Sequence, residues 1–137
     1  MEIEVTREPG GAAFSAVQQG LDAFNASVAP DATATPLNVY LREDGALLGG
    51  LCAHTFWDWL SVGQVWVEES RRRQGVGRRL MAAAEAEAIE RGCRHVYLDT
   101  VDVQAPGFYE KLGYRVVGTL EDFPPGGRKF FLTKDLG

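Results

Sequence analysis

The segment Arg71–Arg79 reads RRRQGVGRR and lies between a β-rich run that ends at Val67 and a helical apolar stripe. A helix N-terminus offers unpaired backbone N–H groups and about half a positive charge, and glycines let an anion approach the backbone. The arginines add planar donors that match phosphate oxygens. A solvated basic helix start is the plain alternative, but Gly75 and Gly77 disfavour it, because glycine in a helix costs about 1 kcal/mol relative to alanine. The segment predicts a phosphate site.

The remaining elements follow from hydrophobic spacing. Apolar residues at steps of three and four predict helices at residues 12–28, 75–91 and 106–112. Alternating or β-branched runs predict strands at residues 2–6, 37–42, 94–99, 114–118 and 129–133. They also predict one strand that begins at residue 46 and another that ends at residue 67. Asp44-Gly45 and Trp57-Asp58 mark hairpin turns. The strand, helix and strand around residues 65–99 predict a right-handed βαβ crossover with two parallel strands.

Three phosphate-binding patterns compete for residues 71–79. A Walker loop is excluded, because no Gly-Lys-Ser or Gly-Lys-Thr is present in the segment. A dinucleotide fingerprint is closer, since Asp99 ends the next strand where a ribose-binding acid belongs, but Leu80 replaces its third glycine. A nicotinamide dehydrogenase therefore stays open as an alternative. The third pattern is Arg-x-x-Gly-x-Gly, formed by Arg72, Gly75 and Gly77.

This third pattern, together with the downstream segment Phe108–Tyr114 (FYEKLGY), resembles the GCN5-related N-acetyltransferase (GNAT) family over about residues 36–134. The resemblance implies an α/β fold with a mostly antiparallel mixed sheet, a central splayed parallel strand pair and helices on both faces. It also implies acetyl-CoA as cosubstrate. With 137 residues, the chain is expected to form a single N-acetyltransferase domain over residues 1–137.

The resemblance also implies a set of cofactor contacts. Backbone amides in the glycine loop are expected to hold the diphosphate, arginines to lie beside it, and a free strand edge to pair with the pantetheine arm. These residues are, in chain order, Val67, Arg72, Arg73, Gln74, Gly75, Val76, Gly77 and Arg78. One departure stands at Asp102, where family members commonly carry asparagine; a carboxylate cannot donate the amide's hydrogen bond. Gln104 is a candidate substitute.

Three residues are candidates for the acetyl-transfer chemistry. The resemblance implies that the Tyr109 hydroxyl gives a proton or a hydrogen bond to the leaving thiolate. The alternative is that Tyr109 packs as a core aromatic. Glu68 and Glu69 follow the strand and are candidates for a general base; each is otherwise an exposed acid that pairs with the arginines. A backbone N–H near Val67 is a candidate donor to the oxyanion.

The predicted function is transfer of an acetyl group from acetyl-CoA to a primary amine of a small molecule or peptide by direct attack. The alternative is a non-catalytic acyl-CoA-binding or sensing module. A net charge of -5 argues against a protein that binds duplex DNA through overall positive charge, and it fits a cationic small substrate better.

Other residues limit the partners. Cys52, Cys93, His54 and His95 show no metal-ligand spacing, so no metal is expected. No secretory signal or membrane span is expected, and the predicted location is cytoplasmic. The tryptophans at 57 and 59 flank a hairpin tip, where they either line an acceptor pocket, contact a second subunit in a homodimer, or pack internally. Phe123 is expected to border the acceptor site.

Overall fold

The computed structural model describes residues 1–29, 33–102 and 106–137. The chain divides into two units, Met1–Thr33 and Ala34–Gly137, and each is described by itself. The expectation of one domain over residues 1–137 stays a prediction.

The first unit contains the helix α1, Ala12–Val28, which confirms the helix predicted at these residues. The strand predicted at residues 2–6 is wrong: residues 1–9 form no helix or strand, and Ile3 and Val5 are exposed. Alternation of apolar residues is not sufficient for a strand, because its backbone N–H and C=O groups need a neighbouring strand as partner. The predicted apolar stripe of α1 is present on one face, and its side chains are exposed: Phe14, Val17, Leu21, Phe24 and Val28.

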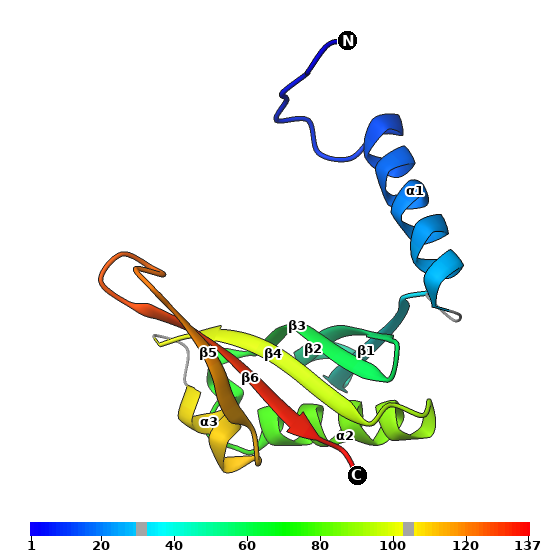
Figure 1. The fold of residues 1–137 in the computed structure, drawn as a ribbon. Coiled ribbons are helices and arrows are strands. Elements are labelled where there is room, and N and C mark those ends of the chain that lie inside the picture. The colour runs from blue at the N-terminus through cyan, green and yellow to red at the C-terminus, as the bar shows by residue number, and fades with distance from the viewer. Residues whose placement is uncertain (30–32, 103–105) are drawn as a thin grey trace. The chain divides into compact units, whose positions relative to one another are not determined.

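The second unit is built on a six-stranded sheet with the order β1-β2-β3-β4-β6-β5 (Figure 1). Neighbouring strands pair antiparallel except β3 and β4, which pair parallel, as predicted for the βαβ crossover. The strands are β1 (Thr35–Glu43), β2 (Ala46–Phe56), β3 (Trp59–Val67), β4 (His95–Val101), β5 (Arg115–Glu121) and β6 (Arg128–Asp135).

Two tight turns set the register of the first three strands. Asp44 and Gly45 have φ of 49° and 83°, the left-handed values that a two-residue hairpin loop requires. Trp57 and Asp58 adopt the same region, with φ of 46° and 67°, although neither is glycine. Both hairpins predicted from the sequence are therefore confirmed.

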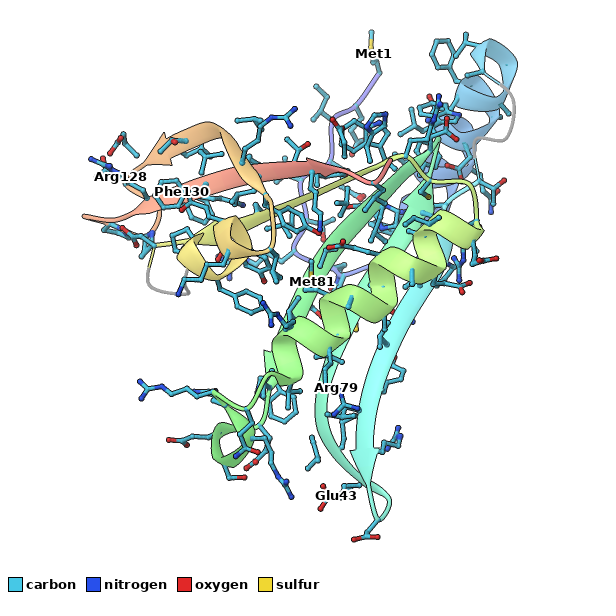
Figure 2. All side chains as sticks on the ribbon, turned by 90° about the horizontal axis from the view of Figure 1, so that it is seen from below. Met1, Glu43, Arg79, Met81, Arg128 and Phe130 are labelled. Carbon is cyan, nitrogen blue, oxygen red and sulfur yellow. The ribbon has the colours of Figure 1, made fainter. Side chains whose placement is uncertain are left out.

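The helix α2 (Val76–Glu90) covers β1, β2 and β3. It ends before Gly92, whose φ of 87° is the expected left-handed helix stop. Its buried face contacts the sheet through a core that includes, from both layers, Leu51, Leu60, Leu80, Met81, Ala84, Ala88, Val96 and Leu132. Figure 2 views this face of the sheet with Met81 on α2.

The short helix α3 (Pro106–Lys111) lies on the same side of the sheet as α2 (Figure 1). Residues 34–137 therefore place both of their described helices on one face. The second helical layer, expected on the opposite face, stays a prediction.

The parallel pair separates part-way along its length. Pairing between β3 and β4 runs from Trp59 with His95 to Val62 with Leu98, although β3 continues to Val67 and β4 to Val101. Beyond that point β3 remains paired with β2, and β4 with β6. Figure 2 shows the two groups of strands running in different directions. The predicted splay is confirmed, because the β3–β4 pairing stops at Val62 and Leu98 while both strands continue.

Candidate active site

A cleft of about 820 Å³ opens where β3 and β4 separate. Five parts of the chain line it: the end of β3, the arginine-rich turn, the start of α2, the end of β4, and α3. The lining residues that enter the argument below are Val67, Arg72, Arg73, Gly75, Val76, Gly77, Arg78, Asp99 and Tyr109. The structure thus brings most of the predicted cofactor residues and Tyr109 into one cleft.

The start of α2 has the backbone geometry of an anion site. Gly75 is the N-cap and has φ of 79°, a left-handed conformation that disfavours other residues. Space is open where a side chain of Gly75 would lie. The first backbone N–H groups of a helix have no intrahelical acceptor, so those at residues 75–78 are available to a bound anion.

Glycine is needed at position 77 for a different physical reason. A Cβ atom at this position would lie 3.1 Å from Cζ of Phe108, so the absence of a side chain lets α3 pack against α2. Phe108 is partly buried against the hydrophobic core. The second glycine of the motif therefore also helps to place the neighbouring Tyr109.

Three side chains of the arginine-rich turn make hydrogen bonds to neighbouring residues, and two of them, Arg72 and Gln74, are also exposed. Nη2 of Arg71 lies 3.1 Å from the Glu43 carboxylate, and Nε of Arg72 donates to the Val67 carbonyl at 3.2 Å. Gln74 Nε2 donates to the Ser70 carbonyl at 3.1 Å. Arg72, Arg73 and Arg78 are exposed and line the cleft. Positive charge therefore gathers at the α2 end of the cleft.

Val67 occupies the last position of β3, where it pairs with Gly49 of β2. Its carbonyl accepts the hydrogen bond from Arg72, so this oxygen is already engaged by the arginine-rich turn. Its other backbone groups lie at the end of the edge that the splay exposes. The location fits the predicted pairing with an extended ligand arm, which stays a prediction.

Glu68 and Glu69 lie beyond the end of β3. The Glu68 carboxylate accepts hydrogen bonds from the backbone N–H and the hydroxyl of Ser70, which caps a single 3₁₀ turn over Glu69–Arg71. At ~3.3 Å per strand residue, Glu68 is about 20 Å along the chain from Val62, where the splay begins. Neither glutamate is among the residues that line the cleft in the described chain. Their role as general base stays a prediction.

Tyr109 projects from α3 into the cleft. Its ring packs edge-on against Phe108 at 5.0 Å and Tyr114 at 5.9 Å between centroids. Burial raises the pKa of its hydroxyl above that of an exposed tyrosine. Tyr109 therefore keeps its proton at neutral and mildly alkaline pH, and it can donate it in a hydrogen bond.

A partly buried polar network contacts Tyr109 through the ring of Tyr114, and the sequence did not predict it. The Tyr114 hydroxyl donates to Glu85 at 2.8 Å, and Lys134 Nζ lies 2.8 Å from the other oxygen of Glu85. Burial, followed by the interaction with Glu85, raises the pKa of Tyr114. The network joins α2, the start of β5 and β6. No spacing rule links these residues, because they meet only through tertiary contacts.

Two acids near the end of β4 have separate roles. Asp99 is exposed and lines the cleft; the sequence singled it out only within the dinucleotide alternative. Asp102 accepts a hydrogen bond from the Arg128 N–H at 3.0 Å, and its own N–H donates to the Arg128 carbonyl. Asp102 therefore holds β6 beside the end of β4. Gln104 lies outside the described residues.

An apolar pocket of about 410 Å³ lies elsewhere on the sheet. Trp57, Trp59 and Tyr97 line it, and the Trp59 ring lies 4.6 Å from the ring of His95. His95 itself pairs with Asp135.

Among residues 1–29, 33–102 and 106–137, no group of three or more His, Cys, Asp and Glu residues is arranged to hold a metal.

Within the same described ranges, none of the helices has the length and apolar character needed to cross a membrane.

Comparison with known proteins identifies the family. Residues 11–114 match the model of the acetyltransferase (GNAT) family. The chain belongs to this family. GNAT enzymes use acetyl-CoA, so this chain is an acetyl-CoA-dependent N-acetyltransferase that acts on an amine. The nicotinamide dehydrogenase alternative is wrong, because the glycine loop belongs to an acetyltransferase domain.

Individual GNAT relatives match over most of the chain. A blasticidin-S acetyltransferase from Streptomyces morookaense is 45% identical over 112 residues, covering 78% of this chain and 82% of the relative. An acetyltransferase from Agrobacterium fabrum is 35% identical over 123 residues, covering 89% of this chain and 90% of the relative. A solved structure from Agrobacterium tumefaciens superposes with a TM-score of 0.92 at 32% identity, covering 98% of this chain and 99% of that one.

Replacing Gly75 by glutamate is expected to abolish acetyl-CoA binding, because an anionic side chain would enter the space above the α2 N-terminus. Gly92→Glu is the matched control: it lies at the other end of α2, has a φ of 87° and also faces open space. Isothermal titration with acetyl-CoA would separate the two variants. An unchanged affinity of Gly75→Glu for acetyl-CoA would refute the predicted diphosphate-binding site.

Replacing Tyr109 by phenylalanine is expected to lower kcat by about 10- to 100-fold, the usual contribution of a general acid, with little change in the KM for acetyl-CoA. Because burial raises the pKa of Tyr109, its hydroxyl keeps its proton at neutral and mildly alkaline pH. The ratio of wild-type to variant kcat should therefore stay constant between pH 7 and 9. Tyr97→Phe, which lies outside this cleft, is the control. If the ratio of wild-type to variant kcat already decreases at a pH below 9, the assignment is contradicted.

Proposed function

We propose that the acceptor is a small cationic amine of the blasticidin S type. The observation that carries this proposal is the 45% identity, over most of both chains, to a protein named blasticidin-S acetyltransferase. A second relative, streptothricin acetyltransferase from Streptomyces lavendulae, is 32% identical over 84 residues, covering 58% of this chain and 44% of the relative. The proposed reaction is acetylation of an amine of such a compound.

The charge distribution of the cleft supports a cationic acceptor. Arg72, Arg73 and Arg78 are placed beside the α2 N-terminus, where an anionic cosubstrate is favoured. Asp99 contributes a carboxylate at the other side of the cleft, next to the start of the splay. The net charge of -5 adds a long-range attraction for cations. The two substrates thus meet oppositely charged parts of one cleft.

The proposed cosubstrate site follows from the same arrangement. The acetyl-CoA diphosphate binds the amides of residues 74–77, with arginine side chains beside it, and the pantetheine arm pairs with the exposed edge of β3. This assigns cofactor binding to Val67, Arg72, Arg73, Gln74, Gly75, Val76, Gly77 and Arg78. The support is that all of them but Gln74 line the cleft.

The proposed reaction is direct transfer. The amine nitrogen attacks the thioester carbonyl carbon, an N–C bond forms, and the C–S bond breaks. Tyr109 donates a proton or hydrogen bond to the leaving sulfur, and the nitrogen loses its proton to water or a carboxylate, for which Glu68 and Glu69 remain candidates. An alkylamine with a pKa near ~10.4 must lose that proton at a cost of about 4.6 kcal/mol at pH 7, so a proton path is needed.

We further propose a cytoplasmic location. Cys52 is exposed and Cys93 is buried, and both are free thiols. Unpaired cysteines are typical of a reducing compartment, and acetyl-CoA must be available there.

We also propose that the protein forms a homodimer through α1. The stripe of Phe14, Val17, Leu21, Phe24 and Val28 gives α1 one apolar face, and an apolar face of this kind marks an interaction surface. Analytical ultracentrifugation is expected to give a dimer for the wild type and a monomer for Phe24→Glu. Gln19→Glu, on the opposite face of α1, should stay dimeric. A monomeric wild type would refute the homodimer.

A CoA-release assay tests the acceptor. With acetyl-CoA, blasticidin S is expected to give the highest kcat/KM in a panel that also contains streptothricin, amino acids and peptides with free amines. Mass spectrometry should show blasticidin S with one added acetyl group. Preference for a peptide or a neutral amino acid would refute the proposed acceptor class.

A further inference from the structure

Asp99 lies at the point where the two central strands separate. The last β3–β4 pair joins Val62 and Leu98, so Asp99 is the first β4 residue beyond it. Its neighbours Leu98 and Thr100 are buried, whereas Asp99 is exposed on the opposite face of the strand. Asp99 and Tyr109 line the same cleft. A carboxylate therefore borders the cleft that also contains the proposed proton donor.

This carboxylate already binds an ammonium group from the protein itself. Lys129 Nζ lies 3.4 Å from Oδ1 of Asp99, 4.4 Å from the ring centroid of Phe123 and 5.5 Å from that of Phe131. The β4–β6 ladder, which pairs Asp99 with Phe131 and Val101 with Lys129, holds the participating backbone positions together. A carboxylate beside two aromatic faces is a general recognition site for organic cations.

We infer that Asp99, Phe123 and Phe131 form a subsite for a cationic group of the acceptor, and that the Lys129 ammonium occupies this subsite until the acceptor displaces it. The inference rests on the proposed function, since it requires a cationic acceptor. It names the residues that select such an acceptor, which neither the glycine loop nor Tyr109 does. Asp99 is then an acceptor-binding residue, and Lys129 is an internal competitor.

The exposures of the pair support this direction of exchange. The Asp99 side chain is 50% exposed and the Lys129 side chain 21%, so the group offered to an incoming molecule is the carboxylate. Ion pairs with this much solvent access are weak, and a lysine side chain moves readily because of its flexible stem. A ligand cation that also makes other contacts in the cleft can therefore replace Lys129.

Substitutions at the two positions test the inference because they must act in opposite directions. With blasticidin S as acceptor, Asp99→Asn should raise the acceptor KM by about 10- to 100-fold, the range for losing a hydrogen bond to a charged group. Lys129→Gln should lower it by roughly 2- to 5-fold, as expected for removing a weak competing ion pair. The KM for acetyl-CoA should not change in either variant.

Glu121→Gln is the matched control, because Glu121 forms an exposed ion pair with Arg128 on the same β5–β6 hairpin. Its acceptor KM should equal that of the wild type. Thermal melts with and without acetyl-CoA would verify that each variant folds and binds its cosubstrate. If both Asp99→Asn and Lys129→Gln raise the acceptor KM, the pair is structural and the inference is overturned.

A different result would show that the proposed acceptor is wrong. If the wild type releases no CoA with blasticidin S, that assignment fails, and the same three variants are compared with the amine in the panel that gives the highest rate. Opposite shifts in KM on that amine would support the ammonium subsite. An unchanged acceptor KM in Asp99→Asn would overturn it.

Discussion

The separation of β3 from β4 is the constraint on which the site depends. Had the parallel ladder continued beyond Val62 and Leu98, the two strands would satisfy each other's backbone groups and leave no cleft. Because each strand keeps its outer neighbour, the sheet stays continuous while its centre opens. A register shift between Cys52 and Ala53 in the β2–β3 ladder accompanies this change, and such irregularities increase local twist. The opening is therefore built from ordinary strand geometry.

Two glycines place the α2 end of the cleft, and they do so for different physical reasons. Gly75 supplies a left-handed N-cap, which directs the first backbone amides of α2 outward. Gly77 has no side chain, and this lets Phe108 approach the helix. Since Phe108 precedes Tyr109, the same contact that closes α3 onto α2 also fixes where the tyrosine hydroxyl enters the cleft. The proposed diphosphate site and the proposed proton donor are thus coupled through one helix packing contact.

The features that the sequence predicted correctly depend on local rules. Asp44-Gly45, Trp57-Asp58 and Gly92 have the left-handed φ values expected from turn and helix-end chemistry. The strand expected at residues 2–6 failed because alternation says nothing about a pairing partner. The Asp99–Lys129 contact and the Glu85 network were not predictable, since the residues in each come from elements far apart in the sequence. The splay followed from the family resemblance, because no propensity rule specifies where a ladder stops.

Positive and negative side chains lie in different parts of the cleft, and this arrangement links the glycine loop, Asp99 and Tyr109. A cleft of uniform charge would not direct an anionic cosubstrate and a cationic acceptor to different ends. The arginine-rich helix start and the carboxylate at the splay would give each of the proposed substrates its own end. Tyr109 lies in the same cleft in a protonated state, because burial raises the pKa of its hydroxyl. In the proposed reaction a neutral donor suits this position: a tyrosinate would repel the leaving thiolate, whereas a phenol would stabilise it without adding charge. The burial that the aromatic contacts of α3 impose on Tyr109 would therefore serve the proposed chemistry as well as the fold.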